Sequence, residues 1–262
     1  MNLRRTIIVR CSGWFLRWFH QSRRTRSEAV KLSGSTALIT GANRGLGRHF
    51  AAELLERGAT KIYATARNPE QIDLPGVEVL PLDITDPEAV AAAARAAADV
   101  DLLINNAGIS VPQSLITGDL DLIRRELETH FFGTLSMTRA FAPVLATNGG
   151  GAILNILSVL SWLGFAGAGG YAAAKAAQWS LTDTTRLELA AQGTQVSAAI
   201  LAATDTDMMA GYDVPKNNPA DVVRTTLNAL EEGQLEILVD EAAATTKANL
   251  SADVHTRYPN LA

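Results

Sequence analysis

One short stretch, "GGYAAAKAA" (169–177), carries a tyrosine and a lysine whose spacing could support proton transfer. Alanine is the strongest helix former, so the composition predicts a helix. Tyr171 and Lys175 are four residues apart and would lie on the same face of that helix. A free phenol has a pKa of about 10, and a neighbouring ammonium lowers it towards a useful range for acid–base chemistry. The alternative interpretation is an amphipathic helix with two polar neighbours.

A second stretch, "TGANRGLG" (40–47), could bind phosphate groups through its backbone. Gly41, Gly45 and Gly47 allow a tight turn and a close approach of the main chain to a pyrophosphate. A helix beginning here would present unpaired N–H groups to that anion. Any tight strand-to-helix turn can use glycine, so the position of these glycines between an apolar run and a helical pattern favours a nucleotide site.

The elements that position these residues alternate between apolar runs and helical patterns along the chain. Strands are predicted at 35–40, 61–66, 77–83, 101–105, 151–158, 194–201 and 235–240. Helices are predicted at 46–58, 88–98, 119–145, 171–191 and 219–232. This alternation predicts an α/β fold, a doubly wound parallel sheet with helices on both faces. Residues 32–262 are expected to form a single Rossmann-type domain.

Three motifs in this order, "TGANRGLG", "NNAG" (105–108) and Y-x-x-x-K (171–175), resemble the short-chain dehydrogenase/reductase family. The resemblance covers about residues 34–240 and favours the shorter branch of simple carbonyl and alcohol oxidoreductases. It implies that Tyr171 transfers the proton and that Lys175 both binds the nicotinamide ribose and lowers the pKa of Tyr171. It also implies that Ser158, at a strand end, hydrogen-bonds the substrate oxygen.

The cofactor implied by the resemblance is a nicotinamide dinucleotide. NAD binders usually place an acidic residue after the second strand, but the chain reads "ATARNP" there, with Arg67 following the strand and Arg44 in the glycine loop. Two guanidinium groups suit a 2′-phosphate, so NADP(H) is predicted in preference to NAD(H). The resemblance assigns cofactor binding to Gly41, Asn43, Arg44, Gly45, Leu46, Gly47, Arg67, Asp83, Ile84, Asn105, Ala107, Gly108, Tyr171, Lys175 and Thr206.

Two departures from the family pattern keep a rival function open. His130 stands where the family usually has an asparagine that anchors a proton-relay water, so it is either a catalytic residue or a structural histidine. Leu201-Ala202 replace the usual Pro-Gly pair, although Thr206 keeps its place. These changes motivate the alternative of a catalytically impaired NADP(H)-binding redox sensor or scaffold.

The expected substrate pocket is mostly apolar. The segments 159–167 and 207–214 contain no arginine or lysine, which favours a small, neutral, moderately hydrophobic carbonyl or alcohol. The residues expected to line it are Trp162, Leu163, Phe165, Met208, Met209 and Tyr212. By resemblance, a homodimer or homotetramer is expected through the helices 119–145 and 171–191.

Charge is unevenly distributed along the 262 residues. Residues 1–31 hold eight of the 23 basic residues and one acid, whereas the remainder carries 15 basic and 26 acidic residues, which argues against a nucleic-acid partner. The single cysteine excludes an intrachain disulfide and a thiolate metal site, no metal is expected, and the location is predicted to be cytoplasmic. Residues 1–31 are interpreted as a peripheral basic, aromatic extension; a transit-like segment and a membrane-surface helix are alternatives, and membrane association is expected only through them.

Overall fold

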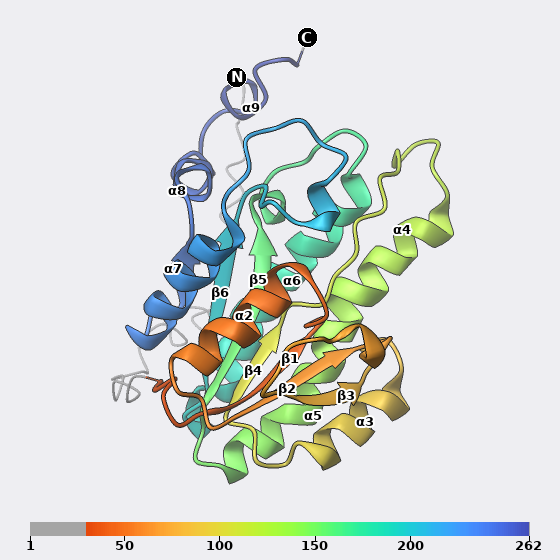
Figure 1. Cartoon of the computed structure of the whole chain (residues 1–262). Helices are drawn as coiled ribbons and strands as arrows, with labels where there is room; N and C mark the ends of the chain where they lie inside the picture. The colour runs from red at the N-terminus through yellow and green to blue at the C-terminus, as the bar shows by residue number, and fades with distance from the viewer. Residues whose placement is uncertain (1–29, 262) are drawn as a thin grey trace, which may run out of the picture.

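The seven strands of the computed structural model, which describes residues 30–261, form one parallel sheet (Figure 1). Their order across the sheet is β3-β2-β1-β4-β5-β6-β7, and every neighbouring pair is parallel. The strands are β1 (Thr36–Thr40), β2 (Lys61–Ala66), β3 (Glu78–Pro81), β4 (Leu102–Asn105), β5 (Ala152–Ser158), β6 (Gln195–Leu201) and β7 (Glu236–Leu238). All seven predicted strands are confirmed, with ends that move by one or two residues.

Helices cover both faces of the sheet because successive strand side chains point to opposite sides. In β1, Ala37 and Ile39 pack against α2 and α7, whereas Leu38 packs against α3 and α5. The helices are α2 (Gly45–Glu56), α3 (Pro87–Ala96), α4 (Leu120–Leu127), α5 (Thr134–Thr147), α6 (Gly169–Leu189), α7 (Pro219–Glu231), α8 (Glu241–Ala248) and α9 (Val254–Arg257). The doubly wound α/β prediction is confirmed.

The strand order reverses between β1 and β4, and this reversal sets the place of a ligand crevice. From β1 the chain moves outward through β2 to β3, and it then returns to β4 on the other side of β1. The loops that follow β1 and β4 therefore diverge at the carboxyl edge of the sheet, where open α/β sheets bind their ligands. The glycine loop and the "NNAG" motif are these two loops.

Two regions differ from the sequence-based prediction. The single helix expected at 119–145 is interrupted by η2, a π-helical segment (Glu128–Gly133) between α4 and α5. Helices α8 and α9 follow the last strand, where no element was predicted. The predicted extension 1–31 lies almost entirely outside the described residues, so its boundary at residue 32 stays a prediction.

Candidate active site

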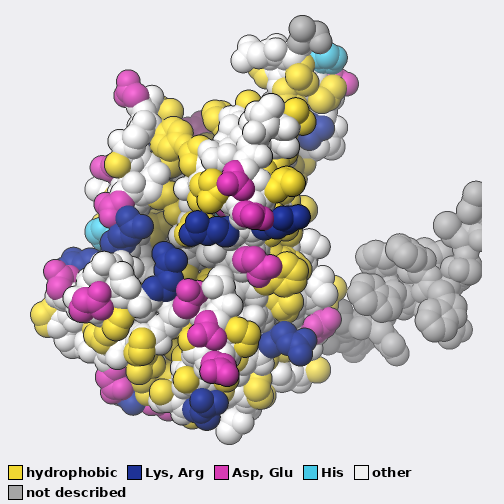
Figure 2. Space-filling view, turned by 90° about the vertical axis from the view of Figure 1, so that its right-hand side faces the viewer, with side chains coloured by type: hydrophobic (Ala, Val, Ile, Leu, Met, Phe, Trp, Pro, Cys, Tyr) yellow, Lys and Arg dark blue, Asp and Glu magenta, His cyan; other side chains and the backbone are white. Residues whose placement is uncertain are grey.

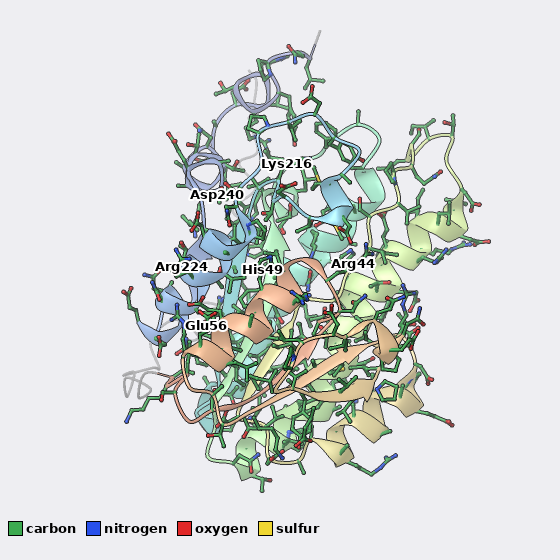
Figure 3. All side chains as sticks on the ribbon, in the orientation of Figure 1. Arg44, His49, Glu56, Lys216, Arg224 and Asp240 are labelled. Carbon is green, nitrogen blue, oxygen red and sulfur yellow. The ribbon has the colours of Figure 1, made fainter. Side chains whose placement is uncertain are left out.

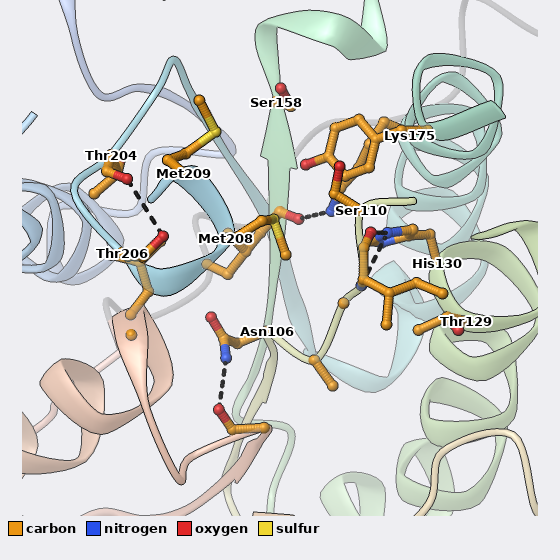
Figure 4. A pocket seen from close by; sticks show the side chains of 18 of the residues that line it. Asn106, Ser110, Thr129, His130, Ser158, Lys175, Thr204, Thr206, Met208 and Met209 are labelled. Atoms are coloured by element: carbon orange, nitrogen blue, oxygen red, sulfur yellow. Dashed lines mark hydrogen bonds between the residues drawn. The ribbon is translucent and has the colours of Figure 1, made fainter. Parts of the chain in front are cut away.

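A large cleft of about 1540 Å³ opens at the carboxyl edge of the sheet. All of the predicted catalytic and cofactor-binding residues line it except Gly47 and Asn105. In Figure 4, His130 and Lys175 lie on one side of the cleft, while Thr206 and Met209 lie on the opposite side. Sequence segments more than a hundred residues apart therefore meet around one space.

The glycine loop has the shape that a pyrophosphate requires. Gly41 and Gly45 have φ angles of +66° and +52°, in the left-handed region that favours glycine. Helix α2 begins at Gly45 after Arg44, and no side chain among residues 30–261 caps its first N–H groups. These N–H groups remain available for an anion, so the loop fits the dinucleotide that the resemblance implies.

Gly47 packs against the glycine loop on the side away from the cleft. A Cβ atom at this position would lie 2.2 Å from the Gly41 carbonyl oxygen and 2.6 Å from Asn106 Nδ2. The absence of a side chain therefore lets helix α2 pack directly against the turn. Gly47 shapes the loop without lining the cleft.

Asn106, which sequence reasoning missed, braces the same loop. Its Nδ2 donates to the carbonyl oxygens of Thr40 at 2.9 Å and Gly41 at 3.1 Å, and Figure 4 draws one of these two bonds. The preceding Asn105 is buried instead, and its Nδ2 donates to Asn155 Oδ1 at 2.8 Å. The structure thus places Asn105 in the sheet, away from the cleft lining. The pair of adjacent asparagines in "NNAG" was the only signal in the sequence that one of them lies in the sheet and the other binds the glycine loop.

The two arginines predicted to bind a 2′-phosphate lie beside the ends of β1 and β2. Arg44 and Arg67 both line the cleft there. Arg44, which Figure 3 labels beside α2, forms an exposed ion pair with Asp207 at 3.0 Å, whereas Arg67 has no polar partner among the residues described. Asp83 Oδ1 accepts from the backbone and side chain of Thr85, which leaves its second oxygen free of hydrogen bonds within the described chain.

Basic and acidic side chains are mixed on the surface of the molecule. Figure 2 shows a broken band of Lys and Arg side chains across the middle of the face turned towards the viewer, with acidic side chains among them. The chain as a whole has a formal net charge of −4.

Lys175 is buried and held firmly. Its Nζ donates to the Ile156 carbonyl oxygen at 2.7 Å and to Gln178 Oε1 at 2.9 Å, and Gln178 donates in turn to Thr134 Oγ1 at 3.0 Å. An ammonium has three N–H donors, so one remains for a ligand in the cleft. Gln178, one turn after Lys175 on α6, was missed by sequence reasoning although its spacing was visible.

Tyr171 stands in the first turn of α6 with its ring 5.7 Å from Lys175 Nζ. Burial raises the pKa of Tyr171 to about 12, and the neighbouring Ser158 hydroxyl counteracts part of this increase. Burial also lowers the pKa of Lys175 to about 7, which weakens its positive charge near neutral pH. The predicted lowering of the Tyr171 pKa by Lys175 is therefore wrong: burial raises this pKa, and the group that lowers it is Ser158.

Ser158 lies where β5 ends and η3 (Val159–Ser161) begins. Its Oγ accepts from the backbone N–H of Leu160 at 3.1 Å, which leaves the hydroxyl proton to donate to the neighbouring Tyr171 or to a ligand in the cleft. The end of β5 fixes the backbone position of Ser158, and the hydrogen bond from the Leu160 N–H fixes its side chain. The predicted group of Ser158, Tyr171 and Lys175 is thus brought together at one end of the cleft.

His130 is buried in the π-helical segment, with 1% of its surface exposed. Its Nε2 lies 2.7 Å from the Ile109 carbonyl oxygen, and its ring meets Tyr171 edge-on at 5.1 Å between centroids. A Cβ on Gly108 would lie 2.6 Å from the imidazole, so glycine is required there. Burial and then the nearby Lys175 lower the pKa of His130 to about 3. His130 is therefore neutral at physiological pH, which argues against proton transfer by its imidazolium form.

The segment after β6 is fixed without the family's Pro-Gly pair. The Ala202 N–H donates to Asp240 Oδ2 at 2.8 Å, and Asn217 Nδ2 donates to the same oxygen at 2.6 Å. Asp240 also caps α8 (Figure 3). The unexpected helix α8 thus anchors the backbone beside the cleft. Thr206 packs against the glycine loop, since a Cβ on Gly45 would lie 3.5 Å from its methyl group.

The far wall of the cleft is largely apolar, as predicted from the two segments. Leu163, Phe165, Met208, Met209 and Tyr212 line it. Trp162 does not: its ring packs edge-on against Trp179 at 5.9 Å between centroids. The charged Arg125 and Glu128 also border the cleft, from the α4–η2 side.

The chain matches known proteins over most of its length. Residues 35–217 match the family model described as short chain dehydrogenase. The chain is 30% identical over 236 residues to D-erythrulose reductase of Gallus gallus, covering 86% of this chain and 96% of that protein. It is 31% identical to short-chain dehydrogenase cctT of Talaromyces islandicus over 180 residues, which span 63% of that protein.

A solved structure supports the same relationship. The short chain dehydrogenase from Burkholderia cenocepacia J2315, in complex with NADP, superposes with a TM-score of 0.83 and 39% identity, covering 87% of this chain and 98% of that one. The doubly wound parallel sheet together with these matches defines the class of protein as an oxidoreductase. The chain belongs to the short-chain dehydrogenase/reductase family, whose members use a nicotinamide cofactor. No helix within residues 30–261 is long and apolar enough to span a membrane.

Proposed function

We propose that the protein is an NADP(H)-dependent oxidoreductase that interconverts a carbonyl and a secondary or primary alcohol on a small, neutral, moderately hydrophobic substrate. The observation that carries this proposal is the meeting of Ser158, Tyr171 and Lys175 at the end of a cleft that continues to the glycine loop. The cofactor, when bound, supplies or accepts the hydride at the carbonyl carbon.

The residues of the chain provide the proton and the geometry. In the direction of reduction, Tyr171 Oη gives its proton to the carbonyl oxygen as the C–O double bond becomes a single bond. The Ser158 hydroxyl donates a hydrogen bond to the same oxygen and holds it in place. Lys175 uses its remaining N–H to hold the cofactor. Oxidation is the reverse, with Tyr171 accepting the alcohol proton.

NADP(H) is favoured over NAD(H) by the two arginines and by the absence of an acid after β2. Arg67 is free of other polar contacts within the described chain, and its guanidinium can pair bidentately with a phosphate. The related Burkholderia cenocepacia structure is described as a complex with NADP, which supports this choice.

The substrate class is supported by the apolar wall. Phe165 and Met208 are 63% and 40% exposed, so they can bury apolar surface against a ligand. The relative named D-erythrulose reductase acts, by its name, on a small neutral ketone, which supports the carbonyl and the neutral charge of the proposed substrate but, for a sugar, not its hydrophobic character.

A homo-oligomer is also part of the proposal. Phe132 in η2 and Leu187 on α6 are 47% and 60% exposed, and they lie on the predicted oligomer helices. They offer apolar surface that an oligomer contact through these helices would bury. The single cysteine supports the predicted cytoplasmic location.

The test is a screen of purified protein with NADPH against a panel of aliphatic, aromatic and hydroxylated ketones and aldehydes, with NADP⁺ and the matching alcohols for the reverse reaction. Consumption of NADPH that is lost in Tyr171→Phe is the expected result. NADPH binding without turnover of any compound in either direction would contradict the proposal, and it would instead favour the impaired sensor or scaffold.

A further inference from the structure

The segment that follows the last strand returns to the cleft. Helix α8 is fixed on the body of the protein, because Asp240 at its start accepts from Ala202 and Asn217 and because Ala243 is fully buried. Helix α9 comes next and lies above the end of the β5 arrow in Figure 1. The C-terminal segment therefore stands at the carboxyl edge of the sheet, where the cleft opens.

Local contacts define the position of Tyr258, the residue that follows α9. The Asp253 side chain caps the first turn of this helix, and Pro259 prevents the helix from continuing past Tyr258. The Tyr258 carbonyl oxygen accepts from the Leu261 N–H at 3.1 Å, which closes a turn. The Arg257 guanidinium lies 5.6 Å from the centre of the Tyr258 ring and supports its face.

The Tyr258 hydroxyl binds a backbone group that lies 94 residues earlier in the chain. Its Oη accepts from the Gly164 N–H at 2.9 Å. A Cβ on Gly164 would lie 3.6 Å from this oxygen, an ordinary contact distance. Among the residues described, this is the only hydrogen bond between 253–261 and the rest of the chain.

The same bond is the only one that ties residues 164–167 to another element of the described structure. These four residues form an exposed loop between η3 and α6. The hydrogen bond from the Ala168 N–H to the Phe165 carbonyl oxygen stays within this turn of the chain. Phe165, the neighbour of Gly164, belongs to the apolar wall of the cleft. The Tyr258 hydroxyl therefore holds the backbone beside a cleft-lining side chain.

The two ends of the loop are fixed by other contacts. Trp162 packs against Trp179 of α6, and Lys247 of α8 lies 5.9 Å from the centre of the Trp162 ring. At the other end, Gly169 begins α6. Only the middle of the loop, which carries Phe165, depends on α9.

We propose that Tyr258 is a positioning residue that determines substrate specificity: by accepting from the Gly164 N–H, it keeps Phe165 in place as part of the apolar wall. This inference rests on the proposed function, because it requires an apolar substrate that packs against that wall. Tyr258 acts on the binding of the apolar part of the substrate, at a distance from the reacting carbonyl group.

The catalytic group does not depend on this bond. Ser158 ends β5, and its hydroxyl accepts from the Leu160 N–H. Lys175 Nζ donates to the Ile156 carbonyl oxygen and to Gln178. Loss of the hydrogen bond to Gly164 is therefore expected to change KM for an apolar substrate and to leave kcat nearly unchanged.

The test compares two carbonyl compounds from the screen above, one with a phenyl group and one with three carbon atoms, in the full chain with NADPH. Tyr258→Phe removes the acceptor and keeps the ring beside Arg257. We expect KM for the phenyl compound to rise about fivefold, the usual contribution of one hydrogen bond. The KM of the three-carbon compound, which is too short to reach the wall, should stay unchanged, as should kcat and the NADPH dissociation constant.

Thr256→Val is the matched control, because it removes a hydroxyl group from an exposed residue of the same helix. Both of its KM values should equal those of the wild type. An unchanged KM for the phenyl compound in Tyr258→Phe would overturn the proposal. An equal rise for both compounds would do the same, since it would assign Tyr258 a general role in the fold.

A double variant tests whether Tyr258 acts through Phe165. Phe165→Ala should itself raise KM for the phenyl compound, and adding Tyr258→Phe should then raise it by less than about twofold. The full effect of Tyr258→Phe in the Phe165→Ala background would show that Tyr258 acts on another part of the cleft, which overturns the proposal.

Hydrogen exchange separates this inference from the proposed function, because it requires no turnover. Measured by mass spectrometry with NADPH present, the peptide that contains residues 164–167 should exchange about fivefold faster in Tyr258→Phe than in the wild type or in Thr256→Val. Peptides from the glycine loop should be unaffected. Unchanged exchange at 164–167 overturns the role of Tyr258 whether or not a substrate has been found.

Discussion

The two halves of the cleft are built in different ways. On the nucleotide side, the glycine loop is shaped by the absence of side chains, and backbone packs on backbone where Gly47 meets the Gly41 carbonyl. On the substrate side, side chains bind distant main-chain groups: Glu126 binds Val111, Asp240 binds Ala202, and Tyr258 Oη accepts from the Gly164 N–H at 2.9 Å.

This difference predicts different sensitivities. The nucleotide side should tolerate changes of polarity at its packed positions but no added volume, since its backbone cannot move apart without losing the anion site. The substrate side should tolerate changes of volume on its exposed apolar wall but lose order when a single polar atom is removed. The following variants test this contrast, in descending order of expected effect.

The largest effect is expected at the proton-transfer group itself. Tyr171→Phe removes the proton donor but keeps the ring that packs edge-on against His130. We expect kcat to fall by about a hundred- to ten-thousandfold, the usual contribution of a general acid. The NADPH dissociation constant, measured by fluorescence, should stay within about twofold, and an equal loss of binding would place Tyr171 among structural residues.

On the nucleotide side, Gly47→Ala adds a methyl group that would lie 2.2 Å from the Gly41 carbonyl oxygen. Since the obstacle is backbone, we expect a loss of about 3 kcal/mol in the free energy of unfolding, together with weaker NADPH binding. Denaturant titration measures the first and fluorescence the second. Gly211→Ala is the control, because a Cβ there meets nothing within 4 Å. Equal stability of both variants would disprove close packing at Gly47.

The nucleotide side is also the part that the sequence predicts best. Its strands, its first helix and its glycines are close together in the chain, and local pattern alone specifies them. The sequence could not distinguish the roles of Asn105 and Asn106. The alternation of strand residues decides which of these two adjacent asparagines faces the sheet and which reaches the glycine loop.

On the substrate side, His130 should make stability depend on pH. Its pKa falls from 6.5 to about 3 on folding, so the unfolded chain binds more protons between these values. His130 therefore contributes its full share of the free energy of unfolding above pH 6.5. This contribution falls as the pH falls, and at pH 5 about 2 kcal/mol of it is lost. His130→Asn should lose less stability between pH 7 and pH 5 than the wild type, as measured by denaturant titration. The exposed His255→Asn should keep the wild-type slope, and an identical slope in His130→Asn would refute the buried neutral state.

The substrate side was predicted less completely, for physical reasons. The motif located Ser158, Tyr171 and Lys175, but their pKa values depend on burial, which spacing does not reveal. The sequence therefore predicted a lowered pKa for Tyr171, whereas burial raises it. The π-helical turn and α8 depend on tertiary contacts, such as Asp240 with Ala202, that join residues 38 apart in the chain. Local propensity carries little information about such contacts.

The preference for NADPH over NADH tests the charge of the nucleotide side, whereas Gly47→Ala tests its packing. Arg67→Ala should weaken NADPH binding about tenfold and leave NADH binding unchanged, because only NADPH carries the 2′-phosphate. The ratio of the two dissociation constants, measured by fluorescence titration, is the relevant quantity. Arg95→Ala, an exposed arginine on α3, should leave this ratio unchanged. A parallel loss for both cofactors would assign Arg67 a role in the fold.

The smallest effect is expected where the two sides touch, at the ion pair of Arg44 with Asp207. Both side chains are about two-thirds exposed, at 65% and 66%, so the pair itself contributes little to stability. Asp207 nevertheless competes with a phosphate for Arg44, and Asp207→Asn should tighten NADPH binding about twofold at low salt and less at high salt. If Asp207 acts through Arg44, the same substitution in an Arg44→Ala background should change the dissociation constant no further. An undiminished gain in that background would show that Asp207 repels the cofactor directly, so that the substrate side contributes its own charge to the nucleotide site.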